Sequence, residues 1–217
     1  ALEVASSVDD GLIEVVRTIP DASLLSNQEY QLLKDQAGLA KTAFTVVCQA
    51  APTSFTMLQP VIMSLRELPD VHLVIRASAT GPSRAYYRRI AQQAGASKRV
   101  VFLEPVSQRD LAAASIGADI GLWTYPDISK NHESVLPSEM FSYAAAGLPL
   151  ATANLREPAQ WLDRFKCGVT FAPYDPHSIA NAINTMRMDY AVFSKAAAEA
   201  KRVLGEEGES DWRKYAD

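Results

Sequence analysis

The sequence predicts an α/β fold, a doubly wound parallel sheet of about six strands covered by helices. Two observations support this prediction. From residue 44 onward, short apolar runs of strand length alternate with segments whose apolar residues recur at helical spacing. The strand-like runs are apolar throughout, as strands buried on both faces require. Alternation of this kind builds βαβ units, which form parallel sheets.

The predicted strands are residues 44–48, 71–75, 99–103, 118–123, 148–152 and 169–171. Between them, residues 58–65 and a segment opening at Gly81 predict helices. A third helix is expected from Ser107, as its cap, to about Gly117, with Asp110 in the first turn. Helices are also expected at 137–146, at 156–165 ended by Gly168, and from Asp175 to about residue 186.

These elements place one Rossmann-like domain at residues 42–186. Residues 1–41 hold an extended candidate at 13–17 and a helical piece at 27–38. Residues 187–217 predict one or two amphipathic helices, with a solvated loop at 206–209. Both ends are expected to make contacts outside the domain that they flank.

Composition excludes several classes of function. The chain has 217 residues, 48% of them hydrophobic, and a net charge of −4. A disordered chain needs lower hydrophobicity and more net charge, and a nucleic-acid binder needs a basic surplus. No apolar stretch is long enough for a transmembrane helix, which leaves peripheral membrane contact open. The start of the sequence resembles neither a signal peptide nor an initiator Met, so a processed or excised chain is expected.

The cysteines and histidines show no metal or redox spacing. Cys48 and Cys167 lie far apart and form no CxxC motif, so we expect buried thiols in a reducing cytoplasm. His72 and His177 fit a strand position and a helix start. No metal and no cofactor are therefore expected.

Ligands of open parallel sheets bind outside the carboxyl ends of the strands. The loop after the first strand, residues 49–54, has small residues that would let a phosphate approach a helix start, with Thr53 and Ser54 nearest to it. It is neither a GxGxxG loop nor a Walker A loop, and a plain strand-to-helix turn is the alternative. Arg76, after the second strand, is the nearest candidate cation.

The most distinctive segment is residues 131–150. From Pro137 to Leu150 it resembles the signature of retaining GT-B glycosyltransferases of the family 4 type, which runs from an acidic loop through a helix into Gly-x-Pro. The run 100–106 is similar to the third strand of the C-terminal domain of this family, Ala118-Asp119 to the helix-to-strand step that follows, and 173–176 to its ending. The resemblance covers about residues 44–217.

The resemblance implies one half of a GT-B architecture, the C-terminal domain that binds a nucleotide-diphosphate sugar. The acceptor would lie in an N-terminal domain of the parent chain, which makes residues 1–41 the connection to it and residues 187–217 crossover helices. No essential metal is implied. The base of the nucleotide would contact the backbone at Pro105 and Val106. The ribose would contact the second Glu of a Glu-x7-Glu pair.

The chain departs from this pattern at the donor site. The two Glu positions are Ser134 and Ser142, and Glu133 lies one residue from the first. Glu139 occupies the position at which relatives carry a basic side chain, and an acidic side chain there would repel a diphosphate. No catalytic residue is assigned. The expected donor-site residues are Thr53, Ser54, Arg76, Pro105, Val106, Glu133, Ser134, Ser138, Glu139 and Ser142.

Several other side chains have both a functional and a structural interpretation. His132 could contact a sugar or be a solvated loop residue, and Tyr125 could line the cleft or pack. Trp123 is expected in the core. The pairs Arg88-Arg89 and Lys98-Arg99 are expected on solvated faces.

Three functions remain open. The first is the donor-binding half of a glycosyltransferase, inactive in isolation. The second is a non-catalytic GT-B-like binding or regulatory domain, favoured by the missing acids. The third is an unrelated nucleotide binder or a nucleotide-sugar epimerase. The segments 137–149 and 173–176 favour the first two, and the first is preferred because another domain could supply charges.

Overall fold

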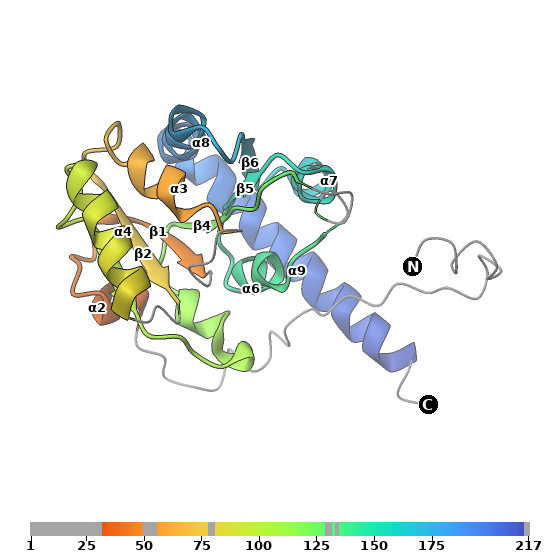
Figure 1. Ribbon diagram of the computed structural model, residues 1–217. Coiled ribbons are helices and arrows are strands. Elements are labelled where there is room, and N and C mark those ends of the chain that lie inside the picture. Colours follow the sequence, from red (N-terminus) through yellow and green to blue (C-terminus); the bar gives the residue numbers. More distant parts are fainter. Residues whose placement is uncertain (1–31, 50–55, 78–80, 129–131, 133–134, 215–217) are drawn as a thin grey trace.

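The computed structural model describes residues 32–49, 56–77, 81–128, 132 and 135–214. Its centre is a six-stranded, all-parallel sheet with the strand order β3-β2-β1-β4-β5-β6 (Figure 1). The strands are β1 Phe44–Gln49, β2 Val71–Arg76, β3 Val100–Leu103, β4 Ile120–Trp123, β5 Leu150–Ala153 and β6 Gly168–Phe171. This confirms the predicted fold class.

Helices cover both faces of the sheet. They are α2 Leu33–Gln36, α3 Leu58–Ser64, α4 Gly81–Gln93, α6 Ser138–Ala145, α7 Arg156–Phe165, α8 Pro176–Met188 and α9 Tyr190–Lys214. The chain runs outward from β1 to β3 and then from β4 to β6. Because these crossovers are right-handed, α3 and α4 lie on one face and α6 and α7 on the other. α8 packs beside α3, and α9 packs against α6 and α7.

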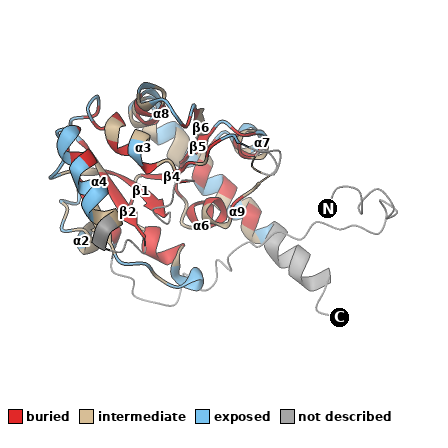
Figure 2. Ribbon diagram, in the orientation of Figure 1, coloured by how far each residue is buried: buried red, intermediate tan, exposed pale blue. Residues whose placement is uncertain are grey.

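The core lies between the sheet and these two helical layers. Strand residues such as Val47, Val74 and Ile120 are fully buried, and the exposed residues lie on the outer surfaces of helices such as α4 and α8 (Figure 2). Tyr87, Ile90 and Ala91 of α4 are buried in this core. Burial on both faces explains why the strands are apolar at every position.

The predicted helix from Ser107 to Gly117 is wrong. The segment forms two short 3-10 helices, η3 Gln108–Asp110 and η4 Ala113–Ser115. The carbonyl of Leu111 accepts from the side chains of Gln49 (2.8 Å) and Ser115 (2.8 Å). The backbone N–H of Ser115 bonds the carbonyl of Ala112 instead, three residues back, which is 3-10 geometry. The Ser107 hydroxyl does not cap; it donates to Asp110 (2.7 Å).

Gly168 does not end α7, contrary to the prediction. Lys166 ends it in the left-handed conformation, at φ 53°, and its N–H donates to the carbonyl of Leu162. Gly168 instead begins β6, where a Cβ atom would lie 1.9 Å from the carbonyl oxygen of Leu150. A close approach between strands therefore requires this glycine.

Arg99 is not on a solvated face. It is half-buried, and its guanidinium donates to the carbonyls of Leu65 (3.0 Å) and Leu68 (2.7 Å), just after α3 ends. These bonds tie the residue that precedes β3 to the turn that follows α3. The neighbouring Lys98, and the pair Arg88 and Arg89, are exposed as predicted.

The C-terminal segment is one continuous helix, so the loop predicted at 206–209 is wrong. Arg202 pairs with Glu199 (2.5 Å) and Glu206 (2.6 Å), one helical turn away on each side. Ala197, Ala200 and Leu204 are buried in the same core as the sheet. α9 therefore packs as part of the Rossmann-like unit. Of the predicted N-terminal elements, 13–17 and residues 27–31 of the helical piece lie outside the described residues; within the rest of that piece, residues 33–36 form α2.

α2 is tied to the amino ends of the central strands. Lys34 forms an ion pair with Asp119 (2.8 Å), and the same carboxylate accepts from the backbone N–H of Thr45 (2.7 Å). Both charged side chains are mostly buried. This cluster lies at the edge of the sheet opposite to the candidate site.

The thiols of Cys48 and Cys167 are free and buried, and burial raises both pKa values to about 12. In the described part of the chain, no three His, Cys, Asp or Glu side chains gather as metal ligands. None of the described helices is both long and apolar enough to cross a membrane.

Candidate functional site

The site lies where the direction of strand addition reverses. β1 and β4 are neighbours in the sheet, yet β1 leads to β2 on one side and β4 to β5 on the other. In open α/β sheets, ligands bind outside the carboxyl ends of the strands at such a point, which makes this edge the candidate site. α6 begins on this edge of the sheet, after the loop that follows β4.

A buried hydrogen-bond network fixes the end of β1. The backbone N–H of Gln49 donates to the hydroxyl of Tyr143 in α6 (2.7 Å), and this hydroxyl donates to the carbonyl of Leu122 in β4 (3.3 Å). The side-chain amide of Gln49 donates to the hydroxyl of Ser115 (2.6 Å) and to the carbonyl of Leu111. Tyr143 therefore locks β1, β4 and α6 together at the switch point.

Gly121 makes room for this tyrosine. A Cβ atom on Gly121 would lie 2.4 Å from Cγ of Tyr143, with two further atoms of that side chain within 2.8 Å. Burial raises the pKa of Tyr143 well above its usual value, with a smaller contribution from Cys48. The phenol stays protonated and keeps its role as both donor and acceptor.

The N-terminus of α6 carries two of the predicted site residues, Ser138 and Glu139. Pro137 precedes the helix, and among the described residues no side chain caps it, so first-turn N–H groups at this edge of the sheet have no side-chain acceptor there. Ser138 and Glu139 are half-buried in this turn. Glu139 lies close enough to β1 that its charge adds to burial in raising the pKa of Cys48.

Ser142 faces inward. It is 1% exposed, and its hydroxyl donates to the carbonyl of Ser138 one turn earlier (3.1 Å). Its oxygen keeps acceptor capacity, but the hydroxyl proton is committed within α6. A ribose contact by Ser142 stays a prediction.

Arg76 lies at the end of β2 and is almost fully buried. Its guanidinium donates to the backbone carbonyl of Glu104 (2.9 Å) and to Gln36 of α2 (2.6 Å), and burial lowers its pKa. These bonds hold the segment that enters Pro105 and Val106, of which Pro105 is exposed and Val106 half-buried. In this structure Arg76 therefore positions the predicted base-binding backbone.

Sequence reasoning missed Arg84. This residue of α4 pairs with the Glu104 carboxylate (2.7 Å), and its guanidinium lies 6.0 Å from the centre of the Phe102 ring. It brings a second cation to the segment before Pro105. Its neighbours Arg88 and Arg89 drew attention as a pair, whereas a single arginine gave no pattern.

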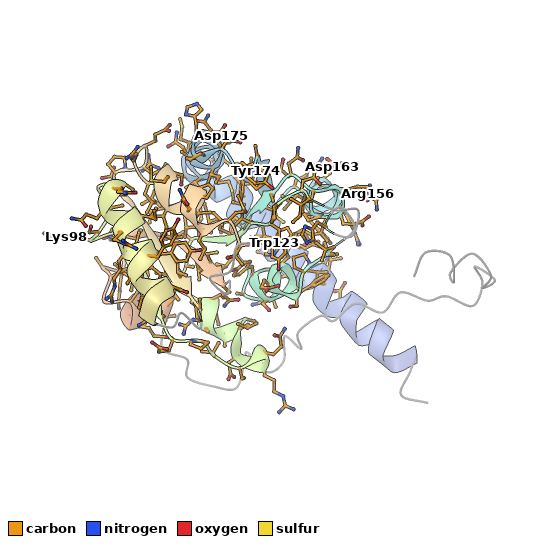
Figure 3. All side chains as sticks on the ribbon, viewed as in Figure 1. Lys98, Trp123, Arg156, Asp163, Tyr174 and Asp175 are labelled. Carbon is orange, nitrogen blue, oxygen red and sulfur yellow. The ribbon has the colours of Figure 1, made fainter. Side chains whose placement is uncertain are left out.

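An aromatic row follows β4. Trp123 is buried, as predicted, in the middle of the molecule (Figure 3), and its ring stacks on Tyr125 at 5.2 Å. Tyr125 meets His132 edge-on at 5.3 Å, and Nδ1 of His132 lies 2.9 Å from the carbonyl oxygen of Pro126. The row orients His132 and packs Tyr125. Thr124 lies between Trp123 and Tyr125 in the sequence, and its hydroxyl is buried with no hydrogen-bond partner in the described part of the chain.

Four predicted site residues lie outside the described residues. They are Thr53 and Ser54 in the loop after β1, and Glu133 and Ser134 in the loop before α6. The described residues bring together the ends of β1 and β4 with the start of α6. Arg76, Pro105 and Val106 lie on the adjacent β2–β3 side.

Solved structures share this arrangement. A glycosyltransferase from Rickettsia africae matches with a TM-score of 0.74 at 12% identity, over 96% of this chain and 56% of that chain. Anabaena HepE in complex with UDP-glucose matches with a TM-score of 0.70 at 17% identity, over 98% of this chain and 60% of that chain. The chain has the fold of one half of a GT-B glycosyltransferase.

Another match is a separately solved domain. The catalytic domain of cholesterol-α-glucosyltransferase from Helicobacter pylori matches with a TM-score of 0.58 at 16% identity, over 75% of this chain and 98% of that domain. The present chain spans little more than half of the length of the first two proteins. No protein-family model and no curated protein sequence matches the chain.

Proposed function

We propose that this chain is the nucleotide-sugar-binding half of a retaining glycosyltransferase. The observation that carries the proposal is the position of α6. The segment that resembles the donor-binding signature forms this helix, and its N-terminus opens without a side-chain cap at the switch point. A helix start of this kind favours the negative charge of a diphosphate.

The remaining roles follow the edge of the sheet. Pro105 and Val106 would meet the base, on backbone that Arg76 and Arg84 hold through Glu104. Ser134 and Ser142 would take the place of the two carboxylates, with weaker hydrogen bonds to ribose or sugar. Thr53 and Ser54 would approach the phosphates from the loop after β1. HepE, which shares the fold, was solved with UDP-glucose bound.

We further propose that transfer needs an N-terminal GT-B domain that holds the acceptor. The chain covers only 56% and 52% of two of the solved proteins that it matches, the Rickettsia africae glycosyltransferase and a sucrose-phosphate synthase from Thermosynechococcus elongatus, which is consistent with a second domain. Neither a metal nor a cofactor is assigned, because donor charge would be met by the helix start and by cations. A cytoplasmic location suits two free thiols.

Nucleotide binding is the direct test of the proposal. UDP or GDP, at about a hundred times its dissociation constant, should stabilise the chain by about 2.7 kcal/mol and raise the melting temperature by about 5–10 °C. The shift should persist in EDTA. A flat response to every common nucleoside diphosphate would contradict donor binding.

Glu139 offers a sharper test of the diphosphate position. Glu139→Lys reverses a charge in the first turn of α6 and should tighten UDP or GDP binding about three- to tenfold. Glu157→Lys makes the same change in the first turn of α7 and should leave binding unchanged. Equal effects of both variants would show that Glu139 does not face the phosphates.

A non-catalytic donor-binding domain is the second candidate. Two observations favour it: the neutral Ser142, whose proton is committed within α6, and the acidic Glu139 at the helix start. Mixing the chain with an acceptor-binding half of a GT-B enzyme and UDP-glucose separates the candidates. Sugar transfer supports the enzyme, and nucleotide binding without transfer supports the regulatory domain.

A further inference from the structure

A second pocket lies on the face of the sheet opposite to α6. It has a volume of about 530 Å³ and is formed by the starts of α3 and α8 and by the first half of α4. Its lining includes Met57, Gln59, Met63, Tyr86, Tyr87 and Tyr174. We call it the tyrosine pocket. The starts of α3 and α8 follow parallel strands, so the pocket opens near the carboxyl edge of the sheet, and Tyr174 lies beside α8 (Figure 3).

The lining combines exposed aromatic rings with polar tips. Tyr86 is 40% exposed and Tyr174 is 54% exposed, although side chains of this size are usually buried. The hydroxyl of Tyr86 donates to Gln59 (2.8 Å), and its ring meets Tyr87 edge-on at 5.1 Å. These contacts hold two of the three rings in fixed orientations before any ligand arrives.

The described lining residues are all uncharged. An anion such as a nucleotide diphosphate would find no cation there, and a cation would find no carboxylate. The lining instead offers flat apolar surfaces, phenolic hydroxyls and an amide. Its volume falls within the range of small-molecule sites, roughly 300–1,000 Å³.

The backbone at the pocket is strained. Met57, which precedes α3, has φ 41° and ψ 35°, a left-handed conformation that a side chain such as methionine rarely adopts. No side chain caps the helix at this position. Strain of this kind gathers at ligand sites, where the surrounding structure maintains it.

We propose that the tyrosine pocket binds a neutral saccharide. A pyranose ring has apolar C–H faces that stack on aromatic rings and an edge of hydroxyls that bond to phenols and amides. Both surfaces occur here together and without charge. The inference rests on the proposed function for its biological meaning: the pocket would hold acceptor sugars remote from the reacting end, and so contribute binding energy from a distance.

Binding of neutral trisaccharides to the full chain tests the proposal. Maltotriose, cellotriose, mannotriose and chitotriose would be titrated in ligand-observed NMR. Saturable binding of at least one is expected, and Tyr174→Ala should weaken it about tenfold by removing a stacking surface. Tyr86→Phe keeps the ring, loses the hydroxyl and should weaken binding about two- to fivefold. Met188→Ala, at an exposed apolar residue that does not line the pocket, should change nothing.

Two results would overturn the proposal: no saturable binding of any of the four sugars, or binding that both tyrosine variants leave unchanged. Displacement of the sugar by UDP would also overturn it, since the donor is assigned to the other site. Tyr174 is exposed, so its variant should fold, which an unchanged melting temperature verifies. The UDP-induced shift of Tyr174→Ala reports separately on donor binding, so a failure of the proposed function is distinguishable from a failure of this pocket.

Discussion

Gly121 leaves no room for a side chain beside Tyr143 at the candidate site. Gly121→Ala places a methyl group against the buried ring of Tyr143, which cannot withdraw without breaking its bonds to Gln49 and Leu122. We expect a loss of about 1–3 kcal/mol in the free energy of unfolding, measured by urea denaturation. Binding of UDP should weaken as well, because the end of β1 moves.

The control for this variant lies in α9. Gly205 is helical, and a Cβ atom there meets nothing within 4 Å. Gly205→Ala should therefore stabilise the chain by about 0.5–1 kcal/mol through the higher helix propensity of alanine. A similar loss in both variants would show that the Tyr143 contact is not the cause.

His72 should make stability depend on pH. Burial, and then the charge of Arg99, lowers its pKa below the ordinary 6.5, and its Nδ1 atom is buried without a partner in the described structure. Between the lowered value and pH 6.5, the unfolded chain binds a proton that the folded chain does not. The neutral His72 side chain therefore makes its full contribution to the free energy of unfolding above about pH 6.5. This contribution is lost as the pH falls below 6.5.

Thermal unfolding of His72→Thr between pH 5 and 8 tests this expectation. The difference from the native chain at pH 8 measures the change in packing alone. Below pH 6.5 the native chain should lose stability more steeply than the variant. Parallel curves would assign the acid sensitivity to other groups.

At the level of elements, a substitution at the C-terminal end of α7 should stabilise the fold. Lys166 occupies a left-handed conformation that costs an L-residue roughly 1 kcal/mol and costs glycine little. Its ion pair with Asp163 is exposed and contributes little. Lys166→Gly should therefore raise the free energy of unfolding by about 0.5–1 kcal/mol in urea denaturation, whereas Lys166→Ala, which also removes the charge, should not.

The strands were predictable because their signal is local. Each of the six apolar runs overlaps an observed strand, and α6 begins within one residue of its predicted start. The 3-10 segments were not predictable, because the group that diverts the carbonyl of Leu111 is Gln49, 62 positions away. A local pattern carries no information about such a contact.

The same limit applies to the candidate site. Sequence pattern located α6 and the strand ends, since these follow from the order of elements. The contact of Tyr143 with Gln49 joins residues 94 positions apart, and Arg84 reaches Glu104 across a strand and a loop. Lys166 ends α7 because Gly168, the better local candidate, is required where β6 meets Leu150.

At the scale of the whole molecule, α9 completes the core. It buries Ala197, Ala200 and Leu204 in the core, and it packs against α6 and α7. Leu204→Ala should cost about 2–3 kcal/mol, measured by urea denaturation. A chain ending at Asp189 should lose cooperative unfolding, because the apolar surface under α9 would face water. Unchanged unfolding of the shortened chain would show that residues up to 189 fold without it.

The position of β3 has a consequence for how the chain behaves at high concentration. β3 is an outer strand of the sheet, so one side of its backbone has no neighbouring strand within the described part of the chain. A groove of about 580 Å³ beside it is lined by the exposed cations Arg88, Arg89 and Lys98, the last at the outer margin of the molecule (Figure 3). Two molecules approaching through this edge would bring like charges together, which opposes edge-to-edge aggregation. Salt screens that repulsion, so the protein should remain dispersed in dilute buffer and begin to self-associate as ionic strength rises.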